Sequence, residues 1–309
     1  MKLLFVSNLY PPNVVGGYER LCFEIAEALA ARGHDVHVLT SHYGTEKADY
    51  PRQIIHRSLK LFVDERNIYR SFTCSPEQRA EWSAQNVAEL DRILSEFRPD
   101  RIFVWNLYFL DASLLDAIKA SGIIPVYLLT DNWLIAFLNP KFIEDYMRDR
   151  VFGGDPQHRS PTLLDRLRIA SGRLPFRLPG HAIFASRFMQ KLYSEAGFGF
   201  NGSDIVYHGV HLDPHAGFAR ARDRLRHTGQ LRLLVAGRVV EIKGVHTAVE
   251  ALPVVRAALP NLKVQLSIVG DSQDDTYLKR LHALAEERGC SDAIEFLPPV
   301  ASADLSALF

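Results

Sequence analysis

Blocks of hydrophobic and polar residues along the chain predict short buried strands, each followed by an amphipathic helix. The first strand is expected at residues 3–7, an apolar run bounded by a Pro-Pro turn, as in a strand covered on both faces. Apolar residues then recur at helical spacing up to Gly33, which can take the left-handed conformation that ends a helix. A second strand is expected over "DVHVLTS", residues 35–41.

The same alternation continues beyond residue 100. Further strands are expected at 101–105, at 124–130 and over "HAIFAS" at 181–186, with helices at about 111–121 and from Ser186 to Gly197. Between Asp131 and His181 the pattern weakens, and we expect short helices and loops there. Strands that alternate with helices in this way predict a parallel sheet with helices on both faces.

A polar, unpatterned segment after residue 210 predicts a domain boundary. The alternation then starts again, with strands expected at 231–238, 263–270 and 293–297 and helices at about 244–259 and 274–288. A chain of 309 residues suits two domains. We therefore expect an α/β protein with domains at 1–210 and 211–309, the second of which has few strands and reads as incomplete.

Composition limits the classes of partner and compartment. Hydrophobic residues make up 47% of the chain, and 36 basic residues balance 36 acidic ones, so a nucleic-acid partner is not expected. Cys22, Cys74 and Cys290 are odd in number and widely spaced, which argues against a disulfide framework and gives no metal-ligand spacing. No apolar stretch reaches the roughly 18 residues of a membrane span. We expect a cytoplasmic protein that needs no metal and no cofactor.

Local charge is less even than the total. Residues 148–191 contain nine basic and three acidic side chains. Such a run forms a solvated face, or it contacts anionic lipid or an acidic acceptor. Peripheral membrane contact therefore stays open, and the sequence does not predict an oligomeric state.

Two adjacent glycines, Gly16 and Gly17, stand where the first strand turns into the first helix. Such a turn leaves the first N–H groups of the helix without partners, and the helix dipole favours an anion there by about 0.3–1 kcal/mol. The pair is either a phosphate site or plain turn chemistry. It is not the dinucleotide fingerprint, because the spacing Gly-x-Gly-x-x-Gly is absent.

The second domain repeats this arrangement with cations added. Gly237 ends a strand, and Arg238 and Lys243 flank the turn that leads into the next helix at Gly244. A guanidinium and an ammonium beside a helix N-terminus suit a diphosphate. The alternative is a surface arginine and lysine that flank a loop.

These segments together resemble glycosyltransferase family 4, whose members are retaining nucleotide-sugar transferases with the GT-B fold. The resemblance is carried by "SNLYPPNVVGGYERLCFEIAEALAARGHDVHVLT", by "GRVVEIKGVHTAVEAL", which is similar to the Gly-Arg-x-x-x-x-Lys-Gly signature, and by "DIVYHGVHLD" and "LSIVGDS". It covers nearly the whole chain, with the signatures in the family's order. It implies two Rossmann-like domains that face a cleft.

The resemblance also implies roles for individual residues. Arg238 and Lys243, with Gly237, would hold the donor diphosphate and stabilise it as it leaves, without a metal. Gly16 and Gly17 would bring backbone N–H groups to the same diphosphate from the first domain, and closure of the cleft would complete the site. The first domain would bind the acceptor, a polysaccharide, a lipid-linked sugar or a glycoconjugate.

The family often carries His-Asp-x-Trp at the end of a first-domain strand, where this chain reads Thr130, Asp131, Asn132 and Trp133. Asp131 and Thr130 are the candidate catalytic residues, and Asn132 and Trp133 the candidate acceptor contacts. A threonine hydroxyl can bond a sugar hydroxyl but cannot buffer a proton near neutral pH. Asp131 is alternatively only a helix cap. His208 stands where asparagine is usual and is interpreted as a structural filler.

This chain differs from the family pattern, and two alternative functions stay open. Family members continue beyond the position of Phe309 through two glutamates, with seven residues between them, that contact the donor, so we expect a truncated gene or part of a longer protein. Thr130 and the absent glutamates favour a catalytically silent module that binds a nucleotide or a partner. A nucleotide-sugar epimerase of the same fold is a third hypothesis. The aromatic and arginine-rich stretch from Trp133 to Arg177 is the expected acceptor wall.

Overall fold

The computed structural model describes residues 1–14, 16–44, 48, 50–64, 68, 72–148, 174–209, 229–272 and 275–300. The chain divides into two compact units, Met1–Gly209 and Val210–Phe309. The sequence placed the boundary one residue later, after 210. The polar segment expected between the domains lies almost wholly outside the described residues, as does the end of the chain after Val300.

Unit 1 is built on a parallel sheet of seven strands, in the order β3-β2-β1-β4-β5-β6-β7. The strands are β1 (Lys2–Ser7), β2 (Asp35–Ser41), β3 (Ile54–Leu59), β4 (Arg101–Asn106), β5 (Pro125–Leu129), β6 (Phe176–Phe184) and β7 (Phe198–Ile205). The strand order reverses between β1 and β4. Ligands of open α/β sheets bind beyond the carboxyl ends of the strands at such a switch point.

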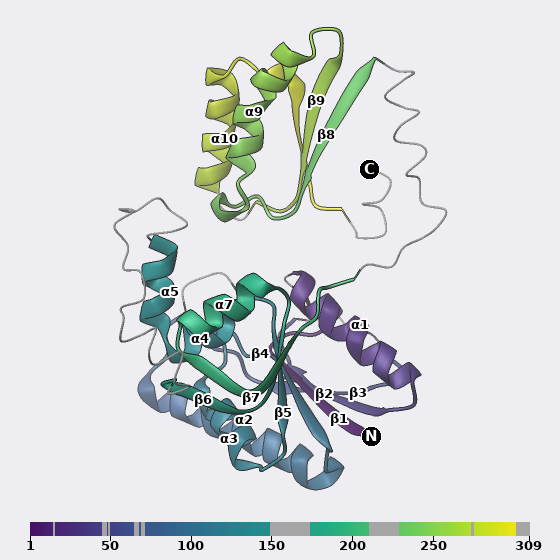
Figure 1. Ribbon diagram of the computed structural model, residues 1–309, viewed down its shortest axis with the longest axis vertical. Coiled ribbons are helices and arrows are strands. Elements are labelled where there is room, and N and C mark those ends of the chain that lie inside the picture. Colours follow the sequence, from purple (N-terminus) through teal and green to yellow (C-terminus); the bar gives the residue numbers. More distant parts are fainter. Residues whose placement is uncertain are drawn as a thin grey trace. The chain divides into compact units, whose positions relative to one another are not determined.

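Helices cover both faces of this sheet, with α1 on one side and α2 and α3 on the other (Figure 1). Alternate residues of β1 show the two layers: Leu3 and Phe5 belong to one apolar cluster, and Leu4 and Val6 to the other. The helices are α1 (Gly17–Ala31), α2 (Pro76–Phe97), α3 (Ala112–Ala120), α4 (Trp133–Leu138), α5 (Pro140–Tyr146) and α7 (Arg187–Glu195). The expected layering of unit 1 is confirmed.

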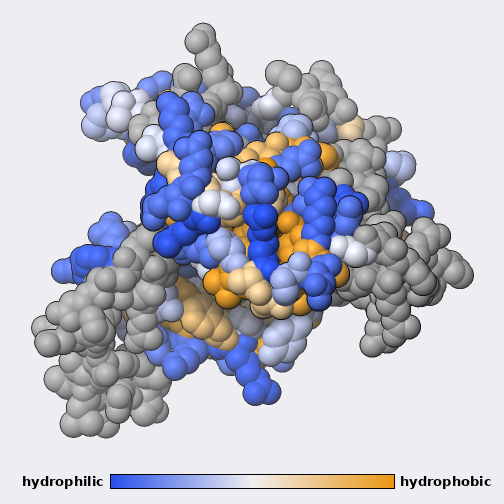
Figure 2. Space-filling view, turned by 90° about the horizontal axis from the view of Figure 1, so that it is seen from above, coloured by the Kyte–Doolittle hydropathy of each residue, from blue (hydrophilic) through white to orange (hydrophobic). Residues whose placement is uncertain are grey.

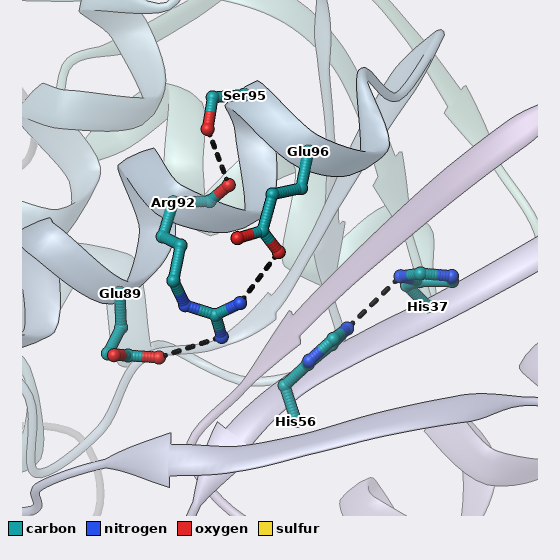
Figure 3. A network of polar contacts seen from close by, with 6 residues as sticks. All are labelled: His37, His56, Glu89, Arg92, Ser95 and Glu96. Atoms are coloured by element: carbon teal, nitrogen blue, oxygen red, sulfur yellow. Dashed lines mark hydrogen bonds and ion pairs between the residues drawn. The ribbon is translucent and has the colours of Figure 1, made fainter.

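Helix α2 combines an apolar face with a charged one. Ser75 caps its start by accepting a hydrogen bond from the Gln78 N–H at 3.2 Å, and Leu90 and Ile93 pack into the core. On the polar side, Arg92 bridges two glutamates of the same helix, Glu89 and Glu96, beside a histidine pair on β2 and β3 (Figure 3).

Unit 2 is smaller in its described part. Three parallel strands run in the order β10-β9-β8, and helices α9 and α10 lie on one side of them (Figure 1). The core consists of apolar residues from all of these elements, such as Val249, Leu266 and Leu281. The elements are β8 (Gln230–Ala236), the 3₁₀ turn η2 (Glu241–Lys243), α9 (Val245–Ala258), β9 (Lys263–Val269), α10 (Asp275–Glu287), the 3₁₀ turn η3 (Ser291–Ala293) and β10 (Ile294–Leu297).

The surface is mixed in polarity. Seen from above, hydrophobic residues reach the surface between hydrophilic ones (Figure 2). Exposed large apolar side chains of unit 2 include Ile242, Val254 and Leu259. Among the described helices, none is both long enough and apolar enough to cross a membrane.

Candidate functional site

The start of α1 lies just beyond the carboxyl end of β1, at the switch point of the sheet. The Gly16 N–H donates to Oε2 of Glu19 at 2.9 Å, and Glu19 is buried. This contact satisfies one of the free N–H groups that begin a helix. Within the described part of the chain, the N–H groups of Gly17 and Tyr18 have no hydrogen-bond acceptor.

The fold itself does not require glycine at positions 16 and 17. Gly16 has an extended backbone, with φ −162° and ψ −161°, and Gly17 is the first residue of the helix. A Cβ added to either residue would meet no heavy atom of the described residues within 4 Å. The two glycines leave open space above the free N–H groups, and this supports a ligand site over plain turn chemistry.

Neighbouring elements hold the first turn of α1 in place. The Tyr18 hydroxyl donates to the carbonyl of Leu128 on β5 at 2.6 Å, and the Trp105 indole N–H donates to the carbonyl of Tyr18 at 2.9 Å. Burial, with the nearby Asp131, raises the pKa of Tyr18 well above its usual value. The hydroxyl therefore stays neutral and acts as a structural donor.

A pocket of about 420 Å³ opens beside this turn. It brings together Gly17 and Thr130, which the sequence placed in the site from segments more than a hundred residues apart. A second hollow of about 270 Å³ shares Thr130 with it. The pocket at Gly17 is lined by Gly17, Tyr18, Arg20, Leu21, Glu24, Thr130 and His208.

Five of these lining residues, Tyr18, Arg20, Leu21, Glu24 and His208, were not assigned to the site from the sequence. Arg20 and Glu24 follow Gly17 at spacings of three and seven, so one face of α1 carries all three; that spacing was the available signal. His208 was interpreted as a filler, and the structure places it in the pocket with an exposed side chain. It is the one imidazole among the residues that line this pocket.

Asp131 caps a short helix. Its Oδ1 accepts a hydrogen bond from the Trp133 N–H at 2.9 Å, so the capping alternative describes this contact. The residue keeps an exposed surface, but protein surrounds its carboxyl group on most sides. This burial, together with the charge of Glu19, raises the pKa of Asp131 against the opposing effect of the Trp133 N–H. A raised pKa suits a carboxyl group that takes or gives a proton.

The expected role of Trp133 as an acceptor contact is wrong. Its side chain is 0% exposed and its ring packs edge-on against Phe137, with centroids 5.8 Å apart. A buried ring offers no surface to an acceptor, so we no longer assign Trp133 to the acceptor site. Asn132 is partly exposed and makes no side-chain capping bond. Residues 149–173 of the expected acceptor wall lie outside the described residues.

In unit 2, the predicted diphosphate residues lie at the carboxyl edge of the sheet. Gly237 has φ +148° and Gly244 has φ +67°, values that favour glycine. The Gly237 N–H donates to the carbonyl of Val269 at 2.9 Å, which ties the loop to the next strand. Arg238 and Lys243 are both exposed on this edge.

The first N–H groups of α9 are largely engaged within the protein. The His246 N–H donates to the Tyr277 hydroxyl at 3.1 Å, and the Thr247 N–H donates to the carbonyl of Gly244 at 2.9 Å. Binding of an anion at this edge would therefore depend on the side chains of Arg238 and Lys243 more than on the helix N-terminus. The sequence predicts a larger contribution from the helix N-terminus.

No described group of three or more His, Cys, Asp or Glu side chains is arranged to hold a metal ion. Unit 1 offers free backbone N–H groups at Gly17 and Tyr18, the Thr130 hydroxyl and the Asp131 carboxyl group with its raised pKa. Unit 2, taken by itself, offers the exposed cations of Arg238 and Lys243.

Family models match most of the chain. The model described as Glycosyltransferase Family 4 matches residues 15–214, and the model described as Glycosyl transferases group 1 matches residues 218–309. The first match covers well over half of the chain.

Named relatives are similar over part of their length. A segment of 124 residues, 38% of this chain, is 32% identical to the D-inositol 3-phosphate glycosyltransferase of Pseudarthrobacter chlorophenolicus and covers 29% of it. Over 286 residues, 89% of this chain, identity to the glycogen synthase of Mycobacterium tuberculosis is 26%, with 63% of that protein covered. The chain thus spans less than two thirds of the length of either relative.

Solved structures share the fold. The sucrose-phosphate synthase of Thermosynechococcus elongatus matches 99% of this chain and 72% of its own, with a TM-score of 0.67 and 16% identity. Anabaena HepE, solved in complex with UDP and glucose, matches 100% of this chain and 71% of its own, with a TM-score of 0.57 and 20% identity. These likenesses confirm the expected α/β class and the GT-B fold.

Proposed function

The chain belongs to glycosyltransferase family 4, and on this premise we propose that it transfers a sugar from a nucleoside-diphosphate sugar to a glycan, lipid-linked or glycoconjugate acceptor with retention of anomeric configuration. The names of its relatives support a carbohydrate substrate, because one is a glycogen synthase and another acts on inositol 3-phosphate. The structure of HepE with UDP and glucose supports the donor class.

One observation carries the proposal: Arg238 and Lys243 are exposed at the same carboxyl edge, on a loop that Gly237 and Gly244 shape. Breaking the bond between sugar and diphosphate builds negative charge on the leaving oxygen. Cations fixed at that point stabilise the charge as it forms. The guanidinium offers paired donors and the ammonium a compact charge, which together suit the two phosphates.

The pocket of unit 1 would contact the sugars. In this proposal the free N–H of Gly17, the second glycine of the Gly16-Gly17 pair, donates a hydrogen bond to phosphate. The Thr130 hydroxyl forms a hydrogen bond with a sugar hydroxyl. His208 supplies an imidazole to the pocket that Thr130 lines. Asp131, with its raised pKa, is the carboxyl group available for proton exchange.

An assay of product stereochemistry tests this function against its competitors. The chain is incubated with UDP-glucose or GDP-mannose, with and without a glycan acceptor, and the anomeric proton of the product is followed by NMR. The proposal predicts an α-linked product from an α-linked donor. A β-linked product contradicts retention, and a donor that returns with an inverted ring carbon indicates an epimerase. Nucleotide binding without any product indicates a catalytically silent module. That hypothesis is based on Thr130, which stands where the family often has histidine.

Location is part of the proposal. We propose a cytoplasmic protein that reaches lipid-linked acceptors through peripheral contact of the basic run at 148–191 with anionic lipid. Liposome co-sedimentation tests the contact. Charge reversal of Arg166, Arg168 and Arg173, which lie outside the described residues, should abolish it, and unchanged binding removes the idea.

A further inference from the structure

Unit 1 contains another pocket, of about 240 Å³, beyond the carboxyl ends of β2 and β3. It shares no lining residue with the pocket at Gly17, although the parallel strands place both at the same edge of the sheet. Nothing in the site described above uses it. It is lined by His42, Tyr43, Gly44, Lys60, Leu61, Val63 and Trp82.

Buried polar contacts fix the two strand ends that form the pocket. Asn86 of α2, which is 2% exposed, holds the backbone of Lys60 on both sides: its Oδ1 accepts from the Lys60 N–H at 2.8 Å, and its Nδ2 donates to the Lys60 carbonyl at 2.9 Å. The Leu59 carbonyl accepts both from the His42 N–H at 3.1 Å and from His42 Nδ1 at 3.0 Å. Lys60 and His42 are therefore presented from a rigid frame.

An aromatic group forms one wall. The Trp82 ring stacks with Phe62, with centroids 5.8 Å apart, and the Lys60 ammonium lies 5.8 Å from the centroid of Trp82. Arg79 lies over the Phe62 ring at 4.5 Å. Cations over aromatic rings at such distances are attracted weakly to the negative face of the ring. The wall therefore combines apolar surface with positive charge.

The polar groups of the pocket are mainly donors. Lys60 has no ion-pair partner among the described residues, and no aspartate or glutamate of the described part of the chain lines the pocket. The Tyr43 hydroxyl accepts from the Ile68 N–H at 3.1 Å, so its own proton remains available to donate. A site with an unpaired cation and donors, and without a carboxylate, favours an anionic ligand over a neutral one.

The volume limits the size of the ligand. At about 240 Å³ the pocket falls below the roughly 300 Å³ at which pockets for drug-sized molecules begin. One sugar ring with a small charged substituent fits this limit better than a disaccharide. The apolar wall at Trp82, Leu61 and Val63 would pack against the sugar ring, and the Lys60 ammonium would pair with the charged substituent.

We propose that this pocket binds one monosaccharide ring that carries a phosphate or carboxylate group, as a subsite for the acceptor. As an acceptor subsite it rests on the transferase function proposed above, whereas the binding itself does not. It would select anionic acceptor sugars, because a neutral ring leaves the Lys60 ammonium without a partner.

Calorimetric titration of the full chain tests the proposal. Glucose 6-phosphate, glucuronate, glucose and inorganic phosphate are titrated into a chain with Arg238→Ala and Lys243→Ala, which removes the other cationic site. Lys60→Gln is then added, with Lys263→Gln as a matched control for lost charge, because Lys263 is an exposed lysine of unit 2. Trp82→Phe reduces the wall while keeping an aromatic ring.

We expect the two anionic sugars to bind, with Kd raised about tenfold or more by Lys60→Gln and unchanged by Lys263→Gln. Trp82→Phe should weaken binding of the sugars more than binding of phosphate. Phosphate that binds as tightly as glucose 6-phosphate would overturn the sugar-ring assignment, and equal affinity for glucose would overturn the anionic one. Absence of binding to all four probes overturns the proposal, and leaves the function tested at Arg238 unaffected.

Discussion

A Cβ atom placed on Gly270 would lie 1.8 Å from the carbonyl oxygen of Gly237. The two glycines end the neighbouring strands β9 and β8, so two backbones approach each other directly at the carboxyl edge of unit 2. A Cβ atom placed on Gly237, by contrast, would meet no heavy atom of the described residues within 4 Å. The close approach therefore places a steric requirement on Gly270 alone, although both residues have positive φ.

Alanine substitutions separate these two requirements. Gly237→Ala destabilises the protein only through the strained positive-φ backbone of the new alanine. Gly270→Ala adds a steric clash that forces the two loops apart, and overpacking costs about 1–3 kcal/mol. Gly270→Ala should therefore lower the free energy of unfolding of unit 2 by at least about 1 kcal/mol more than Gly237→Ala. Hydrogen exchange of peptides from β8 and β9 measures this, with unit 1 peptides as the internal control. Equal losses in the two variants would contradict the steric account.

Gly17→Ala should leave the fold intact and still damage function. The residue is helical and the space at its Cβ is open, and alanine is favoured over glycine in helices by about 0.5–1 kcal/mol. The free energy of unfolding of unit 1 should therefore hold or rise. All three tryptophans lie in unit 1, so urea unfolding followed by fluorescence reports on it.

The same variant should lose transferase activity, because the new methyl group occupies the space above the free N–H groups. Ala28→Gly, further along α1, is the matched control: it changes helix stability in the opposite direction and leaves that space empty. A Gly17→Ala chain with full activity would show that the glycine pair serves only the turn.

Asp131 makes stability depend on pH. Its folded-state pKa is raised above the ordinary 3.8, so the folded chain keeps the proton to a higher pH than the unfolded chain does. The resulting stability is complete below 3.8 and is lost as the pH rises through the raised value. Asp131→Asn, which retains an oxygen to cap Trp133, should therefore gain stability relative to the parent as the pH rises from 3.5 to 7.

Urea unfolding at several pH values measures this difference. Asp111→Asn controls for the loss of a capping carboxylate, since Asp111 accepts from the Ser113 N–H at 3.0 Å at the start of α3. A stability difference between Asp131→Asn and the parent that does not change with pH would contradict a raised pKa.

A histidine pair on β2 and β3 has the opposite pH dependence. Nε2 of His56 lies 3.1 Å from Nδ1 of His37 (Figure 3). The His37 ring also stacks on Phe97, with centroids 3.6 Å apart. Burial lowers the pKa of both histidines; His56 adds to the effect on His37, and Arg92 to that on His56. The other charged groups that act on the pair are Lys2, Asp35, Glu89 and Glu96.

Because their folded-state pKa values lie below the ordinary 6.5, the unfolded chain binds protons more readily than the folded one. Their contribution to stability is therefore complete above 6.5 and is lost as the pH falls. His56→Gln keeps a hydrogen-bonding side chain without the charge and should reduce the loss of unit 1 stability between pH 7 and 5.5. Tryptophan fluorescence in urea measures it, and an unchanged acid sensitivity would contradict the role of the pair.

Much of the fold follows from local pattern. The apolar runs of β1, β2, β4 and β5 are buried strands because helices cover both faces, and Gly33, with φ +86°, follows the end of α1 as expected. The pattern did not predict β3, α2 or β7. In β7, glycines and polar residues dominate, and the strand depends on its backbone ladder with β6. Helix α2 is rich in charge, although Ser75 and Pro76 carry a start signal.

The candidate site could be proposed from the sequence only where a motif marks it. Gly17, Arg238 and Lys243 stand in signatures that the sequence shows directly. The burial of Trp133 and the position of His208 beside Thr130 depend on how distant segments pack, which no local pattern encodes.

The most direct test of the central claim is calorimetric titration of the chain with UDP and GDP. We predict that one nucleotide binds, and that Arg238→Ala and Lys243→Ala each weaken it by more than about 1 kcal/mol, as expected for loss of a charge-assisted contact. Arg232→Ala and Lys263→Ala, exposed cations away from the carboxyl edge on β8 and β9, should leave the affinity unchanged. A nucleotide that binds equally well to the Arg238 and Lys243 variants, or no binding by the folded chain, would contradict the assignment of these two residues to the donor diphosphate.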